Sequence, residues 1–504
     1  MENKSIYASF INSKTNVLIP VLKNGKTLES RYNPESEAIK KLSLVDIKQN
    51  FYVVLGISSG TLLNELVKQN ENAKIIALET CEDDFIFLEN SPLFSKLKQN
   101  KNIIFTTPNA LVQTLITHYI PSFYGKLEII EQQAWCLENT QVYKTIKTLL
   151  NKSLEYISKD FSVQSHFGSL WQKNIINNLR LLQNYDLKYE RKIDTKKTAV
   201  VVAAGPTLDK TINTLKEEDN LFIIATDTAY STLLKNNIFC DVVVNIDAQT
   251  ISTNHFIHQN NDKNTLFVFD LSSNNSICTY LENQGYNVFF TINNHPLSTY
   301  INTLSTNTFH PLFSGSGTVT IAALDLAFLF GFENIKVLGA DFSYNNNKPY
   351  SKGTYLDTIY NINQNKINTL EKNYTNLMYR TPVSIKQNII TTSVLESYET
   401  SFIEYLKEKK AEFYKKDDIY FIQNAAPKNK IIIKSQKNNI IKTLFDDFKK
   451  ASHNFFEKKS INELKNTDIC LLPLISSLRN NENIKEDNFW HLLEIAYNTF
   501  LRLE

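Results

Sequence analysis

Short apolar runs alternate with amphipathic helical stretches along most of the chain, and this pattern predicts an α/β protein. Near the N-terminus, FYVVLG at 51–56 is typical of a buried strand, LLNELVKQN at 62–70 of an amphipathic helix, and KIIALE at 74–79 of a second strand. Because a helix joins the two strands, we expect them to pair in parallel as one βαβ unit.

The middle of the chain carries six more such runs. Each is continuous in apolar residues and most are bounded by helical stretches, which favours a largely parallel sheet covered by helices on both faces. The runs lie at 200–209, 221–227, 240–247, 265–270, 286–291 and 335–341. The segment 318–330 is apolar nearly all round and is followed by Gly331, which predicts a buried helix that ends at this glycine.

With 504 residues the chain is too long for one ordinary domain. We expect an N-terminal Rossmann-like domain at 1–150, a central α/β domain at 151–430 and a C-terminal helical region at 431–504. The third segment is predicted from a Lys- and Asn-rich composition with helical spacing of its apolar residues.

Charge and cysteine content narrow the function classes. The 54 Lys and Arg residues nearly balance the 52 Asp and Glu residues, and the net charge of +2 excludes a protein-wide basic field for nucleic acid or membrane. No apolar run reaches the roughly 20 residues of a membrane span. The five cysteines are far apart in the sequence and form no CxxC pair. We therefore expect a cytoplasmic protein with reduced thiols and with neither nucleic acid nor membrane as a partner.

Two glycine-containing turns are candidates for binding phosphate. Gly205 lies where the run at 200–209 passes from strand to helix, and Ser314-Gly315-Ser316-Gly317-Thr318 precedes the apolar helix. Glycine allows a close approach of the backbone, and a helix N-terminus offers free N–H groups to an anion. The alternative is an ordinary tight turn at Gly205 and a Ser/Thr helix cap at 314–318.

Three aspartates, Asp227, Asp247 and Asp341, close strands of the same predicted sheet. Ligands of open α/β sheets lie at the carboxyl ends of strands, so these carboxylates are candidates for a ribose contact, a metal contact or a catalytic base. Helix capping is the alternative. In the N-terminal βαβ unit, Gly56 and Gly60 with Glu79 resemble only part of a nucleotide fingerprint, and a scaffold role is favoured. His255 and His258 lack an evident third ligand, so no metal site is predicted.

The ordered motifs of the second half resemble the motility-associated factor (Maf) family of flagellin glycosyltransferases, which share a domain similar to 6-hydroxymethylpterin diphosphokinase. The resemblance rests on VVVAAGPTLD, FIIATDTAYSTLLKNNIFCDVVVNIDAQ and FSGSGTVTIAALDLAFLFGFENIKVLGADFS. FGSLWQKNIINNL at 167–179 and TTSVLESYETSFIEYL at 391–406 match flanking elements, while YNPESEA and the first βαβ unit are similar to the family's N-terminal domain more loosely.

The resemblance implies a sialyltransferase-like, Rossmann-type central domain. Family members are thought to transfer a nonulosonic acid, pseudaminic or legionaminic, from a CMP-activated donor to Ser or Thr of flagellin in the cytoplasm, a step required for flagellum assembly and motility. By this resemblance Gly205, Pro206 and Thr207 lie near the nucleotide phosphate, and Asp227 and Asp247 lie beside the nucleotide sugar. Ser314, Gly315, Ser316, Gly317 and Thr318 then surround the donor, and Asp341 faces the reacting centre. No cofactor is expected apart from this donor substrate, and a need for divalent metal stays open.

The catalytic base is the point at which this chain departs from the family pattern. Many relatives follow the strand that ends in Asp with a loop ending in histidine, whereas this chain has NNNKPYSKGTYLD at 345–357. Tyr350 stands at about the place of the histidine, so Asp341 and Tyr350 are the predicted catalytic residues and the identity of the base stays open. The alternatives are a diphosphokinase that uses ATP and Mg²⁺, and a non-catalytic protein that binds flagellin.

Overall fold

The computed structural model describes residues 4–184, 189–256, 263–315, 317–386, 389–437, 439–453, 463–481 and 488–504. The chain divides into two compact units. Unit 1 comprises Met1–Ser169 and Ala451–Thr499, and unit 2 comprises Leu170–Lys450 and Phe500–Glu504. This division differs from the three segments expected from the sequence, because the C-terminal helices contribute to both units instead of packing with one another alone.

Unit 1 contains a four-stranded parallel sheet in the order β5-β4-β3-β6. Its strands are β3 (Phe51–Leu55), β4 (Lys74–Leu78), β5 (Ile103–Thr106) and β6 (Leu127–Glu131), and β1 (Tyr7–Asn12) pairs with β2 (Leu18–Leu22) as a separate ribbon. The helices that accompany them are α1 (Pro34–Leu42), α2 (Thr61–Gln69), α3 (Glu82–Leu88), α4 (Pro92–Lys98), α5 (Leu111–His118), α6 (Pro121–Tyr124), α7 (Gln133–Glu138), α19 (Asn466–Cys470) and α20 (Leu472–Arg479). The predicted βαβ unit and its parallel pairing are confirmed.

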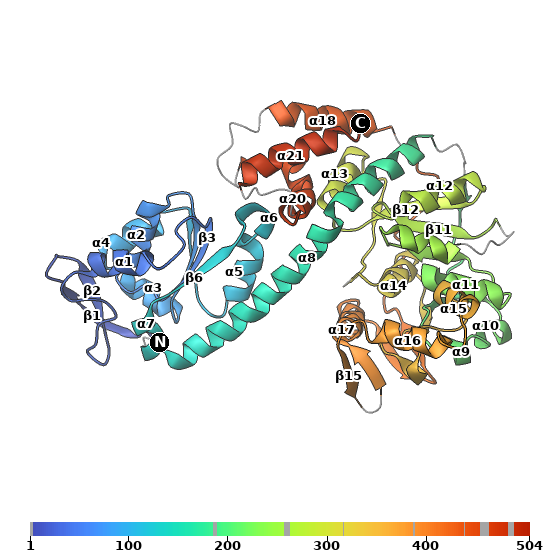
Figure 1. Ribbon diagram of the computed structural model, residues 1–504, viewed down its shortest axis with the longest axis horizontal. Helices are drawn as coiled ribbons and strands as arrows, with labels where there is room; N and C mark the ends of the chain where they lie inside the picture. Colours follow the sequence, from blue (N-terminus) through green and yellow to red (C-terminus); the bar gives the residue numbers. More distant parts are fainter. Residues whose placement is uncertain are drawn as a thin grey trace. The chain divides into compact units, whose positions relative to one another are not determined.

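Unit 2 is built on a nine-stranded sheet in the order β13-β12-β11-β10-β9-β8-β14-β18-β17. Two of its strands, β11 and β12, are labelled in Figure 1. The strands from β13 to β14 run parallel, and β18 and β17 are antiparallel additions at one edge. The strands are β8 (Thr198–Val202), β9 (Leu221–Thr226), β10 (Val242–Asn245), β11 (Leu266–Asp270), β12 (Asn287–Ile292), β13 (His310–Pro311), β14 (Asn334–Leu338), β17 (Glu412–Lys416) and β18 (Ile419–Gln423). All six strands predicted in this part of the chain are present, and the expected α/β fold is confirmed.

Helices cover this sheet. They are α9 (Leu208–Thr211), α10 (Thr214–Glu217), α11 (Asp227–Lys235), η1 (Thr250–Phe256), α12 (Asn275–Asn283), α13 (Pro296–Leu304) and α14 (Val319–Phe330). Helix α18 (Ile441–His453) contacts α13 through the Tyr300 hydroxyl and Asp447, and a small ribbon pairs β7 (Glu190–Arg191) with β19 (Ile433–Lys434). The apolar α14 packs on β8, β9 and β10, and it ends at Gly331, whose φ of 85° suits glycine. His295 caps α13, because its Nδ1 atom accepts a hydrogen bond of 3.2 Å from the Leu297 N–H.

Two buried asparagines of the long helix α8 (Thr140–Asn184) hold the loops at the carboxyl ends of β10 and β11. The Asn174 amide donates to the carbonyl oxygens of Ala248 and Ser272, both at 3.0 Å. The Asn178 amide donates to the carbonyls of Leu271 and Ser273, both at 2.9 Å. The sequence FGSLWQKNIINNL therefore carries two amides that fix the edge of the sheet.

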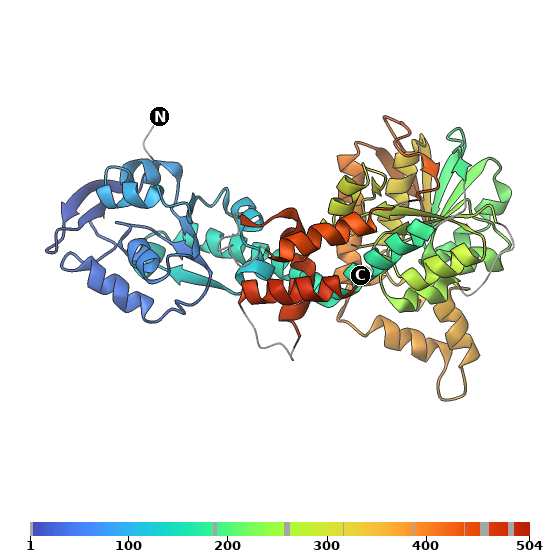
Figure 2. The same cartoon turned by 90° about the horizontal axis from the view of Figure 1, so that it is seen from above.

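An insertion between β14 and β18 adds η2 (Asn345–Asn347), α15 (Tyr355–Ile362), α16 (Leu370–Met378), β15 (Val383–Lys386), β16 (Ile389–Thr392) and α17 (Ser393–Glu408). In Figure 2 the part with α15 and α16, in tan, extends away from the sheet of unit 2. Polar contacts fasten the insertion to the core: the Lys352 N–H donates to Asp209 at 2.7 Å, and the Ser351 N–H donates to the Ala204 carbonyl at 2.9 Å.

Among the described residues, no helix is long and apolar enough to cross a membrane. The last helix of the chain is α21 (Phe489–Leu501), and its side chains Leu492 and Leu493 are buried.

Candidate active site

The strand order of unit 2 points to one edge of the sheet as the place for a ligand. From β8 the chain adds β9, β10, β11, β12 and β13 in turn to one side, and β14 then pairs with the other side of β8. Open α/β sheets bind ligands outside the carboxyl ends of the strands where the order reverses in this way, here β8 and β14. A cavity of about 330 Å³ lies at this switch point.

Segments from six parts of the chain line this cavity. They contribute Ala203, Ala204 and Gly205 after β8, Thr226 and Thr228 around the start of α11, Gly317, Thr318, Val319 and Thr320 at the start of α14, Gly339 to Tyr344 with Pro349 and Tyr350 after β14, and Leu377, Leu395 and Tyr398 from α16 and α17. Glycine-containing turns, residues with hydroxyl groups and one residue with a carboxylate, Asp341, therefore border one small space.

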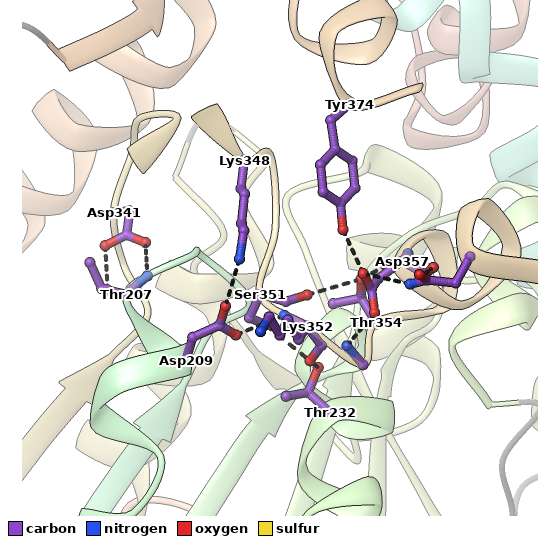
Figure 3. Close-up of polar contacts among 12 residues, drawn as sticks. Thr207, Asp209, Thr232, Asp341, Lys348, Ser351, Lys352, Thr354, Asp357 and Tyr374 are labelled. Carbon is purple, nitrogen blue, oxygen red and sulfur yellow. Dashed lines mark hydrogen bonds and ion pairs between the residues drawn. The ribbon is translucent and has the colours of Figure 1, made fainter. Parts of the chain in front are cut away.

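The turn after β8 is tied directly to Asp341. The Thr207 N–H donates to Asp341 Oδ2 at 2.8 Å, and the Thr207 hydroxyl donates to Oδ1 (Figure 3). A Cβ atom on Gly205 would come well under 3.0 Å from Asp341 Oδ2 and from the Gly339 carbonyl oxygen. Glycine is therefore required at 205 because another part of the protein approaches the turn, and Asp341 is held in place by Thr207.

Burial raises the pKa of the Asp341 carboxyl, and the two hydrogen bonds from Thr207 oppose this effect. Asp341 lines the cavity, and the pKa of its carboxyl is raised from the ordinary value toward neutral pH. Both properties suit a group that accepts a proton.

The start of α14 forms the opposite part of the cavity wall. Thr318 caps the helix by accepting from the Thr320 N–H at 3.3 Å, and Gly317 precedes it with a φ of 92°. The preceding loop is anchored by Asp325, a carboxylate in the middle of the apolar helix: it accepts from the Phe313 N–H at 2.8 Å and from the Tyr405 hydroxyl at 2.5 Å. The positive end of the helix dipole at this wall favours an anionic ligand.

Tyr344, Tyr350 and Tyr398 bring aromatic rings and hydroxyl groups to the cavity from the insertion and α17. Burial raises the pKa of Tyr350 to about 12, and the neighbouring Tyr355, Tyr344 and Asp227 add to this effect. The Tyr350 hydroxyl is therefore neutral near pH 7, which suits a hydrogen-bond donor and does not suit a base.

Asp227 and Asp247 do not line the cavity. Asp227 is buried at the start of α11 and accepts from Asn245 Nδ2 at 2.6 Å and from the Thr228 N–H at 2.6 Å. Asp247 accepts from the Gln249 N–H at 2.9 Å, and burial raises its pKa, with the charge of Asp227 acting in the same direction. Both aspartates therefore have the capping and loop-fixing contacts that were the alternative interpretation from the sequence.

Five of the predicted site residues line the cavity, namely Gly205, Gly317, Thr318, Asp341 and Tyr350. Pro206, Thr207, Ser314 and Gly315 lie in the same two turns but outside the lining, and Ser316 lies outside the described residues. The sequence did not indicate Thr226, Thr228, Tyr344 or Tyr398. Tyr344 directly follows the quoted motif that ends in GADFS, which is the one local signal that could have found it.

In unit 1, the glycine turn at Gly56 and the acidic strand end at Glu79 are covered by other side chains of the same protein. Glu79 is fully buried and accepts hydrogen bonds from the Tyr7 hydroxyl at 2.9 Å, the Ile57 N–H at 2.7 Å and the Trp135 indole N–H at 2.8 Å. A Cβ atom on Gly56 would lie under 3.0 Å from the Trp135 ring. Trp135 therefore covers the glycine turn after β3 and binds the acidic strand end, which favours a scaffold role.

Metal ligands were not predicted from the sequence. In the part of the chain that the structure describes, no three His, Cys, Asp or Glu side chains are grouped so that they could hold a metal ion. His258 lies outside that part.

Comparison with known proteins assigns the family. The model of the family described as 6-hydroxymethylpterin diphosphokinase MptE-like matches residues 173–347. An uncharacterized protein of Treponema pallidum (strain Nichols) is 31% identical over 153 residues, which are 30% of this chain and 72% of that protein. The chain belongs to the MptE-like family. A second uncharacterized protein of the same strain is 40% identical over 122 residues, 23% of this chain and 43% of that protein.

The MptE-like match covers the strands and turns that build the cavity, from α8 to the loop after β14. A solved structure is similar over far more of the chain: the Maf glycosyltransferase from Magnetospirillum magneticum AMB-1 has a TM-score of 0.51 at 13% identity and covers 98% of this chain and 90% of that chain. The similarity confirms the predicted fold, and together with the MptE-like domain it confirms the resemblance noted from the motifs.

Proposed function

We propose that this protein is a glycosyltransferase that moves a nonulosonic acid, of the pseudaminic or legionaminic type, from a CMP-activated donor to Ser or Thr of flagellin. The observation that carries the proposal is the cavity at the switch point, where the glycine turn at Gly205 and the N-terminus of α14 meet. The solved structure that shares the fold over nearly the whole chain is titled a glycosyltransferase, whereas the diphosphokinase description matches only residues 173–347.

In the proposed reaction the acceptor hydroxyl oxygen forms a bond to the anomeric carbon of the sugar, and the bond from that carbon to the phosphate oxygen of CMP breaks. CMP leaves with the electron pair, and the hydroxyl proton passes to a carboxylate. Hydrogen-bond donors aimed at the leaving phosphate stabilise the charge that develops on it. The Val319 N–H is the proposed donor, and the dipole of α14 adds to it, because this helix end lines the cavity.

Asp341 is the proposed acceptor of the proton. It supplies the carboxylate in the cavity lining, and burial raises its pKa toward neutral pH. Tyr350, with a pKa raised to about 12, is proposed to donate a hydrogen bond to the substrate instead of acting as base. We further propose that transfer takes place in the cytoplasm before the flagellum is assembled.

Calorimetric titration with CMP, beside ATP with and without Mg²⁺, tests the donor class. We expect binding of CMP without metal. A preference for ATP–Mg²⁺ would support the diphosphokinase, and binding of no nucleotide would support a protein that binds flagellin without catalysis.

Transfer assays on Asp341→Asn test the base. Loss of a general base lowers rates by roughly 10²–10⁴-fold, so we expect a loss in that range with CMP binding retained. Thr207→Val is the control, because it removes one hydroxyl donor to the same carboxylate and leaves the carboxylate in place. Equal losses in the two variants would show that Asp341 only holds the turn.

A further inference from the structure

A second cavity lies on the outer side of the insertion, and no role has been assigned to it. This outer groove has a volume of about 660 Å³ and is lined by Asn346, Asn347, Lys348, Leu370, Glu371, Tyr374, Thr375, Met378, Tyr379 and Ile390. It is twice as large as the cavity at the switch point, which has about 330 Å³.

The outer groove and the switch-point cavity share one wall. In the loop after β14, Tyr344 and Tyr350 line the inner cavity, and Asn346 to Lys348 between them line the outer groove. In α16, Leu377 faces the inner cavity, and its neighbour Met378 faces the groove. A molecule in the outer groove is therefore separated from the inner cavity by one loop and one helix.

The shared wall is fixed by polar contacts, which are drawn in Figure 3. The Tyr374 hydroxyl donates to Asp357 at 2.5 Å, and Lys348 Nζ lies 3.4 Å from Asp209 Oδ2. The wall is thereby connected both within the insertion and to α9. A preformed wall of this kind limits the ordering cost of binding.

The lining of the outer groove suits a polypeptide. Its floor is apolar, with Tyr374 and Met378 buried, and Ile390 continues it. Ile385 pairs directly with Ile390 across the β15–β16 ribbon, so both side chains lie on one face, and Ile385 is 65% exposed. Exposed apolar side chains beside a groove are typical of protein-binding surfaces.

The rim of the groove supports the same conclusion. The carboxamides of Asn346 and Asn347 offer both donors and acceptors, as a peptide backbone requires. Glu371 places a negative charge on the rim, and Lys348 is already paired with Asp209. The groove is therefore poorly suited to a nucleotide or an acidic sugar, both of which are anions.

We propose that the outer groove binds an extended segment of the acceptor polypeptide, and that the adjoining part of the same polypeptide passes around the shared wall and brings its Ser or Thr hydroxyl into the donor cavity. This inference rests on the proposed glycosyltransferase function and adds the acceptor site to it. The acceptor is recognised by apolar side chains on the floor and by backbone contacts at the rim.

Thr375→Trp tests the proposal by filling the groove. Thr375 is exposed on α16 and lines the groove, so a larger side chain fits without disturbing the core. Asn376→Trp is the matched control, because Asn376 is the next exposed residue of the same helix and lines neither cavity. With unmodified flagellin as the probe, we expect Thr375→Trp to raise the acceptor KM at least tenfold and Asn376→Trp to leave it within twofold, with CMP affinity unchanged in both.

Two results would overturn the assignment: an acceptor KM that Thr375→Trp leaves unchanged, or a loss of CMP affinity in Thr375→Trp, which would assign the groove to the donor. A photo-crosslinking amino acid at Tyr379, on the groove rim, gives a test that does not depend on catalysis. We expect it to capture a Ser- or Thr-containing segment of purified flagellin. The same amino acid at Tyr414, an exposed residue of β17 outside the groove, should capture none.

The two proposals fail in different ways. If the wild-type protein binds no CMP and transfers no sugar, the proposed function fails, and the crosslinks then decide the groove alone. Equal crosslinking from Tyr379 and Tyr414, or none from either, would overturn the acceptor site whatever the outcome for CMP.

Discussion

Replacement of Gly205 by alanine tests the central contact of the candidate site, the approach of Asp341 and Gly339 to the turn after β8. Gly205 does not have a positive φ, so the substitution tests space and not backbone conformation. The added Cβ atom would lie well under 3.0 Å from Asp341 Oδ2 and from the Gly339 carbonyl oxygen. One of these groups must move, and a shift of Asp341 breaks its hydrogen bonds to Thr207.

The magnitude follows from these two effects. Overpacking costs roughly 1–3 kcal/mol, and loss of a hydrogen bond to a charged group costs roughly 1.5–3 kcal/mol. We therefore expect Gly205→Ala to lower the unfolding free energy of unit 2 by about 3 kcal/mol. Urea titration followed by hydrogen-exchange mass spectrometry measures this quantity for each unit separately, and unit 1 should be unchanged.

A double-mutant cycle with Asp341→Ala shows whether the reasoning is correct. Without the carboxylate one of the two clashes disappears, so Gly205→Ala should cost about 1–2 kcal/mol less in that background, within the usual range for residues in contact. The clash with the Gly339 carbonyl remains in both backgrounds. A cost below about 0.5 kcal/mol, or the same cost in both backgrounds, would refute the contact.

Three further substitutions in unit 2 have defined outcomes. Burial lowers the pKa of His295 to about 3, so below pH 6.5 the unfolded chain gains a proton that the folded protein excludes, and stability falls by about 1.4 kcal/mol per pH unit toward pH 3. His295→Asn keeps a capping oxygen and should lose less stability in urea titrations at pH 4 than at pH 7 relative to wild type. Asp325 is buried, and besides its two hydrogen-bond donors it pairs with Lys409 Nζ at 3.2 Å. Asp325→Ala removes the ion pair and both hydrogen bonds and should cost about 3–5 kcal/mol in thermal unfolding. Tyr405→Phe removes one hydrogen bond and should cost about 1.5–3 kcal/mol; equal costs would contradict this. Asn178→Asp replaces two buried amide donors by acceptors and should speed hydrogen exchange at 271–275, whereas the half-buried neighbour Asn177→Asp should not.

The sequence predicts the main features of the sheet because continuous apolar runs have few alternatives once helices separate them. The sequence also predicts that Gly205 and Asp341 lie close together, because the carboxyl ends of the parallel strands β8 and β14 meet at one edge of the sheet. The antiparallel pair β17 and β18 was not predicted: β17, at the sheet edge, has the charged sequence EFYKK, and the apolar run IYFIQ of β18 was not recognised as a strand. The parallel strands β5 and β6 of unit 1 were also missed, because they lie among helices and are only partly buried.

The direction that a loop takes after its strand is harder to predict, because distant parts of the chain determine it. Asp247 follows β10 and was predicted to lie beside the nucleotide; it does not line the switch-point cavity, and its loop is held by an amide of α8 through the Ala248 carbonyl. Tyr398 reaches the cavity from a helix more than 50 residues beyond Asp341 in the chain. Neither relation leaves a local signal in the sequence.

The two units show why a glycine turn after a strand does not by itself predict a ligand site. Both units have such a turn at the carboxyl end of a parallel strand, at Gly56 and at Gly205, and in both a Cβ atom would collide with another part of the protein. In unit 1 the colliding group is the ring of Trp135, an apolar side chain that fills the strand end and binds Glu79 through its indole N–H. In unit 2 the colliding groups are a short carboxylate and the Gly339 carbonyl oxygen, and a cavity of about 330 Å³ remains at the turn. The side chain that packs against the glycine turn therefore distinguishes a scaffold from a candidate site. In unit 2 this side chain is an aspartate, which is the feature that favours chemistry there.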